Sequence, residues 1–277
     1  MKVLHKNIYK FLFCLILLLI AYIPTLRSII KGWMAHESYY GHGFFIPLVS
    51  LFILWQRRNL FREIKISTDN VGLIIVVAGL IMHLICAALK VYFISGVSFV
   101  FVLFGLVLFF FGREVGRNLI FPIFFLLAMI PLPGMLIAGL TIKLKLFAAQ
   151  ASVFLLNNVG FKSLLDGSTI RMPASYLMVE APCSGLRSLI SLLTLGLLFS
   201  YALKSSYLKK GILLISAVPI ALATNILRIT MLAAINDLYG EKIAMGFFHD
   251  FSGFLVFALA FLGLYSVGNT LKAKNEK

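Results

Sequence analysis

The sequence has little charge, and most of the charge that it has is of one sign. Only 13% of its 277 residues are charged, 25 basic against 10 acidic, whereas a soluble globular domain carries about 25% charged residues. Apolar residues make up 61% of the chain, and its mean hydropathy is +1.01. A chain of this size cannot hide so much apolar surface from water, so a soluble enzyme and a disordered chain are both excluded. We infer that lipid surrounds most of the protein.

Cysteine is scarce as well. The three cysteines, Cys14, Cys86 and Cys183, are too few and too scattered for a disulfide framework or a zinc site. We therefore predict no metal site and no cofactor. Cys14 and Cys86 fall inside apolar runs, where cysteine behaves as a small hydrophobic residue, whereas Cys183 lies between polar and charged residues.

The excess of basic residues does not predict nucleic-acid binding, because Lys and Arg form no stripe with interleaved aromatic residues. They occur in short clusters between apolar runs, as membrane topology produces. The clusters at one predicted face precede the first run, occupy 57–65, 113–117 and 204–210, and follow residue 271. Because cytoplasmic loops are enriched in Lys and Arg, we expect both termini to lie in the cytoplasm.

Eight apolar runs are candidates to cross the hydrocarbon core, which takes about 20 residues of helix. We predict an all-α, polytopic membrane protein that forms a single domain over 1–277. The candidate spans are about 9–28, 41–56, 71–89, 91–111, 118–140, 184–203, 210–233 and 250–270.

The longest connection, about 141–182, falls on the extracytoplasmic side. Its first half is amphipathic and is expected to lie in the interface or to re-enter it. The Asp166-Gly167 turn signal and the β-prone stretches around Pro173 then predict a small β-hairpin. Arg171 in this hairpin is a candidate contact for a substrate. His42, at the outer end of the second run, either borders a substrate channel or has a structural role.

Polar residues gather at the ends of three spans on that same side. Ionisable residues at such positions are costly unless they are paired or wet, so they are candidate functional residues. The sixth span opens with Cys183, Ser184, Gly185 and Arg187; the seventh ends with Asn225 and Arg228; the eighth opens with His249 and Asp250.

Together these residues fit nucleophilic catalysis by a thiol. The pKa of a cysteine falls at a helix N-terminus or beside a cation, and Cys183 has both features. His249 suits proton transfer, with Asp250 or Glu180 to orient it, while Arg228 can stabilise an oxyanion. Taken one at a time, such residues more often pack, cap a helix or snorkel. Their shared depth and side of the membrane favours a common site.

Three ordered motifs resemble the exosortase/archaeosortase family. They are Val179–Leu189 (VEAPCSGLRSL), Asn225–Ile229 (NILRI) and His249–Gly253 (HDFSG), preceded by the early segment Gly41–Pro47 (GHGFFIP). The resemblance covers about residues 35–265. Pro182 departs from it, since many relatives carry a small or polar residue there, and this leaves the substrate subtype open.

The resemblance implies a cysteine transpeptidase of the prokaryotic inner membrane that cleaves a C-terminal sorting tail from exported proteins. Such a tail consists of a short motif, a transmembrane helix and a basic end. In this interpretation Cys183 is the nucleophile, Arg228 stabilises the transition state and His249 is the acid/base, all at the extracytoplasmic face. Besides such substrates, the expected partners are membrane lipids.

Two other functions remain open from the residues alone. One is a non-catalytic transporter or flippase that binds an anionic, lipid-linked substrate through Arg228 and His249. The other is a membrane acyl- or glycosyltransferase, which the sequence favours least because it lacks an Asp-x-Asp motif or a His-x-x-x-x-Asp motif.

Overall fold

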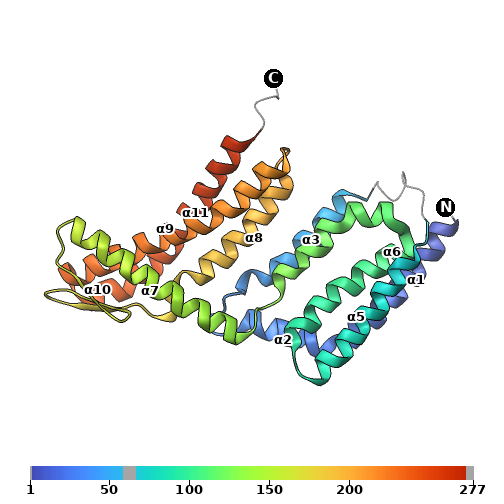
Figure 1. Ribbon diagram of the computed structural model, residues 1–277, viewed down its shortest axis with the longest axis horizontal. Helices are drawn as coiled ribbons and strands as arrows, with labels where there is room; N and C mark the ends of the chain where they lie inside the picture. The colour runs from blue at the N-terminus through green and yellow to red at the C-terminus, as the bar shows by residue number, and fades with distance from the viewer. Residues whose placement is uncertain (1, 59–66, 273–277) are drawn as a thin grey trace. The chain divides into compact units, whose positions relative to one another are not determined.

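The computed structural model describes residues 2–58 and 67–272. The chain forms two compact units, residues 1–133 and 134–277, and Figure 1 shows the helices of each. That the whole chain acts as one domain, with its interfacial segment at 141–182, stays a prediction.

Unit 1 consists of helices broken at two defined points. Pro24 lies at the start of α2, and α1 and α2 meet there at an angle of 67°. The second break is at Gly112, whose φ of +86° divides α6 into two legs. Phe101 and Phe104 on the first leg contact Phe124 on the second, so α6 folds back on itself. The elements are α1 (Lys2–Ala21), α2 (Ile23–Met34), the 3-10 helix η1 (Gly41–Phe44), α3 (Phe45–Gln56), α5 (Asn70–Ala88), α6 (Tyr92–Phe125) and η2 (Leu126–Met129).

Small residues let α5 and α6 approach closely. A Cβ atom on Gly72 would lie 2.5 Å from the carbonyl oxygen of Gly105, and one on Gly105 would lie 2.9 Å from the carbonyl oxygen of Gly72. Lipid gives little hydrophobic drive for helices to associate, so close backbone approach is one of the main sources of stability for such a pair.

A buried polar cluster holds the bend between α1 and α2. Ser95 Oγ on α6 hydrogen-bonds Thr25 Oγ1 at 2.6 Å and His83 Nδ1 at 2.8 Å. The ring of His83 stacks on Tyr22, and the Tyr22 hydroxyl hydrogen-bonds Ser98 Oγ at 2.8 Å. All five side chains are buried, so each polar group satisfies another inside the apolar unit.

Unit 2 is built on three helices, α8, α9 and α11, which pack side by side (Figure 1). Leu192, Leu213, Ala217 and Leu264 are among the buried residues that join them. The elements are α7 (Gly134–Asn158), β1 (Leu164–Asp166), β2 (Thr169–Arg171), β3 (Tyr176–Met178), the 3-10 helix η3 (Ala181–Ser184), α8 (Leu186–Ala202), α9 (Tyr207–Tyr239), α10 (Glu241–Ile243), the π-helix η4 (Ala244–Phe248) and α11 (His249–Leu271).

The predicted hairpin is present and has a third strand. Gly167 makes the β1–β2 turn with a φ of +62°, and β2 pairs with both β1 and β3 in antiparallel register. Ile170 and Leu177 are buried in a cluster with residues of α7 and α9, so the sheet packs on these two helices.

The all-α, multi-pass class is confirmed, but the expected number of spans is too high. Five helices among the described residues are long and apolar enough to cross a membrane, or six if α1 and α2 form one bent span. The runs at 41–56 and 184–203 form helices shorter than 18 residues. The run at 118–140 is divided by Pro131 and Pro133, so its halves belong to α6 and α7.

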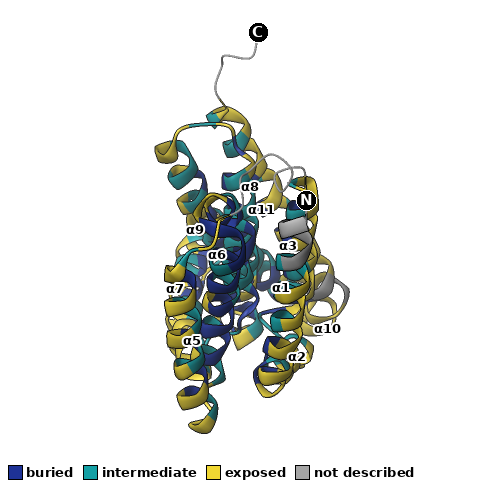
Figure 2. Ribbon diagram, turned by 90° about the vertical axis from the view of Figure 1, so that its right-hand side faces the viewer, coloured by how far each residue is buried: buried dark blue, intermediate teal, exposed yellow. Residues whose placement is uncertain are grey.

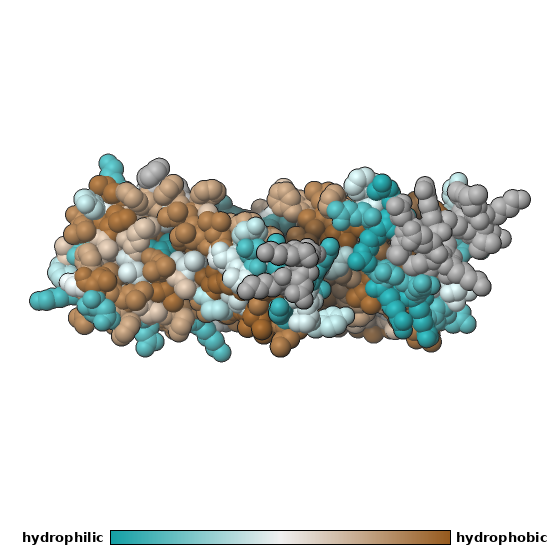
Figure 3. All heavy atoms as spheres, turned by 90° about the horizontal axis from the view of Figure 1, so that it is seen from above, coloured by the Kyte–Doolittle hydropathy of each residue, from teal (hydrophilic) through white to brown (hydrophobic). Residues whose placement is uncertain are grey.

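The exposed surface fits a lipid environment. Figure 2 shows that α6 is largely buried, whereas α5 and α7 expose long faces, and large apolar residues make up much of what is exposed. Apolar residues likewise cover much of the face in Figure 3. Several basic residues that predict orientation, Arg62, Lys65, Lys274 and Lys277, lie outside the described residues.

Removing the Ser95 hydroxyl tests the polar cluster. Ser95→Ala leaves Thr25 and His83 each short of a buried partner, which should lower the free energy of unfolding by about 1–2 kcal/mol. Ser50→Ala is the matched control, because the buried Ser50 hydroxyl has no hydrogen-bond partner. Thermal unfolding in detergent should separate the two variants. Equal stabilities would contradict the role given to Ser95.

Candidate active site

A sharp corner, formed by residues 181–185, places Cys183 immediately before α8. Pro182 and Cys183 lie in η3, and the amide of Cys183 donates to the carbonyl of Glu180 at 3.1 Å. Gly185 then adopts a φ of +79°, which favours glycine, and serves as the N-cap of α8. The amide of Leu186 at the start of α8 donates to Ser184 Oγ at 3.4 Å. Cys183 thus lies just before the helix N-terminus, which is the positive end of the helix dipole.

Asn225 fixes this corner to α9. Its Nδ2 donates to the carbonyl oxygen of Cys183 at 2.9 Å, and the side chain is buried. Gly185 packs directly against it, since a Cβ at Gly185 would lie 2.8 Å from Asn225 Cγ. Asn225 is one of the candidate residues of the sequence analysis, and its acceptor is the backbone of the predicted nucleophile.

Arg228 lies one turn further along α9 and reaches α11. Its Nε donates to Ser252 Oγ at 3.0 Å, and Ser252 is fully buried. Gly253 lies next to the guanidinium, since a Cβ there would make an ordinary van der Waals contact of 3.7 Å with its nearest nitrogen. One helix thus holds both the corner of Cys183 and the start of α11.

A polar cavity of about 360 Å³ opens where these three helices meet. Its lining includes Arg187, Asn225 and Arg228 but no carboxylate, so its net charge favours an anionic or strongly polar group. Cys183 does not line it, although its neighbours Pro182 and Gly185 do. The lining is Pro182, Gly185, Arg187, Ser188, Ser191, Asn225, Arg228, Gly253, Val256 and Phe257.

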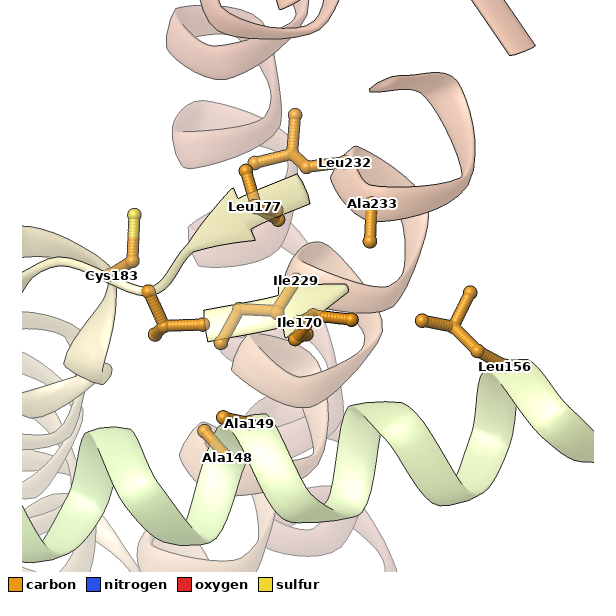
Figure 4. Close-up of a cluster of buried hydrophobic side chains, with 10 residues drawn as sticks. Ala148, Ala149, Leu156, Ile170, Leu177, Cys183, Ile229, Leu232 and Ala233 are labelled. Atoms are coloured by element: carbon orange, nitrogen blue, oxygen red, sulfur yellow. The ribbon is translucent and has the colours of Figure 1, made fainter. Parts of the chain in front are cut away.

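The Cys183 side chain is 8% exposed and lies at the margin of an apolar cluster formed by α7, the sheet and α9 (Figure 4). Ile229 and Val179 belong to the same cluster. Burial in apolar surroundings disfavours a thiolate, whereas the helix terminus favours it.

The third motif, His249–Gly253, begins α11. His249 is its first residue, one turn before Ser252, and Asp250 follows. The side chains of His249 and Asp250 lie outside what the structure describes, so their roles stay predictions. Within the described residues, no group of three His, Cys, Asp or Glu side chains is placed to hold a metal ion.

A comparison with known protein families shows which family the chain belongs to. Residues 33–266 match the family described as transmembrane exosortase (Exosortase_EpsH). The chain belongs to the transmembrane exosortase family. The match spans both units and contains all three motifs, and it supports a transpeptidase or sorting role in the membrane. Searches of curated proteins and of solved structures found no significant match.

Four other predicted residues of this exosortase do not line the cavity. Ser184 is buried just before the start of α8. Arg171 is exposed, and its guanidinium pairs with Asp166 across the β1–β2 turn at 2.7 Å. Glu180 is exposed and contributes its carbonyl to η3. His42 lies in unit 1, with its ring near that of Tyr40. Their roles toward a substrate stay predictions.

The sequence did not single out two residues that support the site. Ser252 holds Arg228, and its place in the His249–Gly253 motif was the available signal. Asp237 accepts hydrogen bonds from the backbone of Ala174 and from the Ser175 hydroxyl, which ties the sheet to the end of α9. Asp237 lies in the last turn of α9 and looks like a solvated helix end, so no local pattern reveals this contact.

Gly185→Ala tests the corner. The left-handed conformation costs a non-glycine residue about 1–2 kcal/mol, and the Cβ would press on Asn225, so the exosortase should lose stability and Cys183 should shift. A displacement of this kind costs an enzyme up to about 100-fold in rate.

The matched control is Gly211→Ala on α9, where a Cβ meets nothing within 4 Å. This change should be neutral or stabilise the helix by about 0.5–1 kcal/mol. Thermal unfolding and processing of a tail-bearing substrate measure both effects. Equal behaviour of the two variants would refute the role of the Gly185 corner.

Proposed function

We propose that this protein cleaves the C-terminal sorting tail of exported proteins through a thioester on Cys183. The observation that carries the proposal is the pair of hydrogen bonds from α9, Asn225 to the Cys183 carbonyl and Arg228 to Ser252. They join the three family motifs at one cavity. Family membership supports the general role of a membrane transpeptidase. The roles of Cys183, Arg228 and His249 are part of the proposal.

In the first step the Cys183 thiolate attacks the carbonyl carbon of a peptide bond just outside the substrate's transmembrane helix. The guanidinium of Arg228 and backbone N–H groups at the start of α8 stabilise the oxyanion. The carbon–nitrogen bond then breaks, and His249 donates a proton to the leaving amine. The tail leaves, and the rest of the substrate stays on Cys183 as a thioester.

In the second step an amine or water attacks the thioester carbon. His249 accepts the proton of the attacking group, the carbon–sulfur bond breaks and the Cys183 thiolate is restored. Asp250 or Glu180 orients His249 in this scheme. Ser184, Gly185 and Asn225 hold the corner, while Arg187, Arg171 and His42 are proposed contacts for the substrate.

The proposed orientation puts both termini in the cytoplasm and the site at the extracytoplasmic face. The basic clusters at the predicted cytoplasmic ends support it. A substrate anchored by its own transmembrane helix would then present its cleavage site at the depth of the cavity, with its basic end in the cytoplasm.

Paired substitutions separate this mechanism from a flippase that binds an anionic lipid-linked substrate, which the two cavity arginines also favour. Cys183→Ala should abolish processing of a tagged, tail-bearing substrate, a loss of about 10⁴-fold or more. Arg228→Ala should reduce processing by about 10²–10³-fold. The measurement is the fraction of substrate cleaved with time in reconstituted membranes.

Cys86→Ala is the matched control, because Cys86 is also buried but packs within unit 1. It should process substrate at the normal rate. Normal cleavage by Cys183→Ala would rule out Cys183 as the nucleophile. No cleavage by the unsubstituted protein, together with binding of an anionic lipid that Arg228→Ala abolishes, would favour the flippase.

A further inference from the structure

Unit 1 contains a second cavity, larger than that of unit 2 and of opposite character. Its volume is about 660 Å³, within the range of small-molecule sites. Residues of α1, α2 and α3 and of both legs of α6 line it, and every lining residue except Ser50 is apolar. Along α1 the lining runs from Ile8 to Leu19, on the order of 16 Å of helix.

We expect the cavity to be neither filled with water nor empty. Water needs two to four polar partners, and the lining offers one hydroxyl that is itself buried. An empty void of this size would forfeit dispersion contacts along five helical segments. The cavity is therefore filled by apolar matter from its surroundings, and in a membrane that matter is hydrocarbon.

The length of the cavity distinguishes a lipid chain from a helix. A membrane-spanning helix is about 30 Å long, roughly twice the lined length along α1. The hydrocarbon of one leaflet is about 15 Å thick, which matches the lined length along α1. We propose that this cavity binds an acyl chain of a membrane lipid.

The two tryptophans provide reporters inside and outside the cavity. Trp33 lines it and is held by a hydrogen bond from Nε1 to the carbonyl of Met129 at 2.8 Å. Trp55 does not line it and is 58% exposed on α3. Trp55→Phe leaves Trp33 as the only tryptophan, and Trp33→Phe leaves Trp55.

Ser50 is the position at which to fill the cavity. Its hydroxyl has no hydrogen-bond partner, so replacing it breaks no hydrogen bond. Ser50→Phe adds a ring to the lining, and Ser50→Leu adds a smaller group that serves if the first variant does not fold. Leu48→Phe is the matched control, because Leu48 lies on the same helix, is 61% exposed and does not line the cavity.

The test reconstitutes the full-length protein in bilayers of phosphatidylcholine with dibrominated acyl chains, which quench tryptophan fluorescence on contact. Quenching of Trp33 should fall at least twofold in the Ser50 variants and should be unchanged in Leu48→Phe. Quenching of Trp55 should be the same in all of them, since that residue reports on surrounding lipid.

Equal quenching of Trp33 in the Ser50 variants and in Leu48→Phe would overturn the proposal. So would relief of Trp33 quenching by a synthetic transmembrane peptide with a basic end, because the occupant would then be a helix. The readout does not depend on processing activity, so it stands or falls apart from the proposed function.

Discussion

The hydrogen bond from Asn225 to the carbonyl of Cys183 is the contact on which the site depends. It holds the segment before α8 against the middle of α9, and Gly185 packs against the same Asn225 side chain with a φ of +79°. In an apolar interior a buried amide without its acceptor costs several times what the hydrogen bond contributes in water. The corner and α9 are therefore constrained together, and a thiol is fixed beside a helix N-terminus.

The need to satisfy buried polar groups also shapes the rest of the protein. Lipid cannot satisfy polar groups, so polar side chains pair with one another where helices break. The cluster around Ser95 does this at the bend between α1 and α2, and Arg228 with Ser252 does it at the start of α11. Apolar contacts join the straight parts of the helices, and polar contacts fix the breaks.

Much of this could be predicted from the sequence. The composition identified the membrane class, and the motifs around Cys183, Arg228 and His249 identified the family. The number of spans was overestimated because hydropathy measures the apolar character of a run and not the length of its helix. Pro131 and Pro133 divide one such run between two helices, and Gly112 reverses α6 inside a stretch that reads as continuous.

Contacts between distant elements could not be predicted. Asp237 looks like a solvated helix end, yet it binds the loop after β2, and Ser252 gains its role only because α11 packs on α9. These contacts follow from packing, which a local pattern does not encode. The apolar cavity of unit 1 could not be predicted either. Its lining comes from four helices whose sequences are apolar on most faces.

The most direct test of the central claim is to trap the acyl-enzyme. A tail-bearing substrate is incubated with the reconstituted protein, the reaction is quenched in acid, and the peptide containing Cys183 is identified by mass spectrometry. The account predicts that this peptide carries the portion of the substrate upstream of the cleavage site and releases it on treatment with neutral hydroxylamine. Cleavage of the substrate with no adduct on Cys183, or with the adduct on another residue, would contradict it.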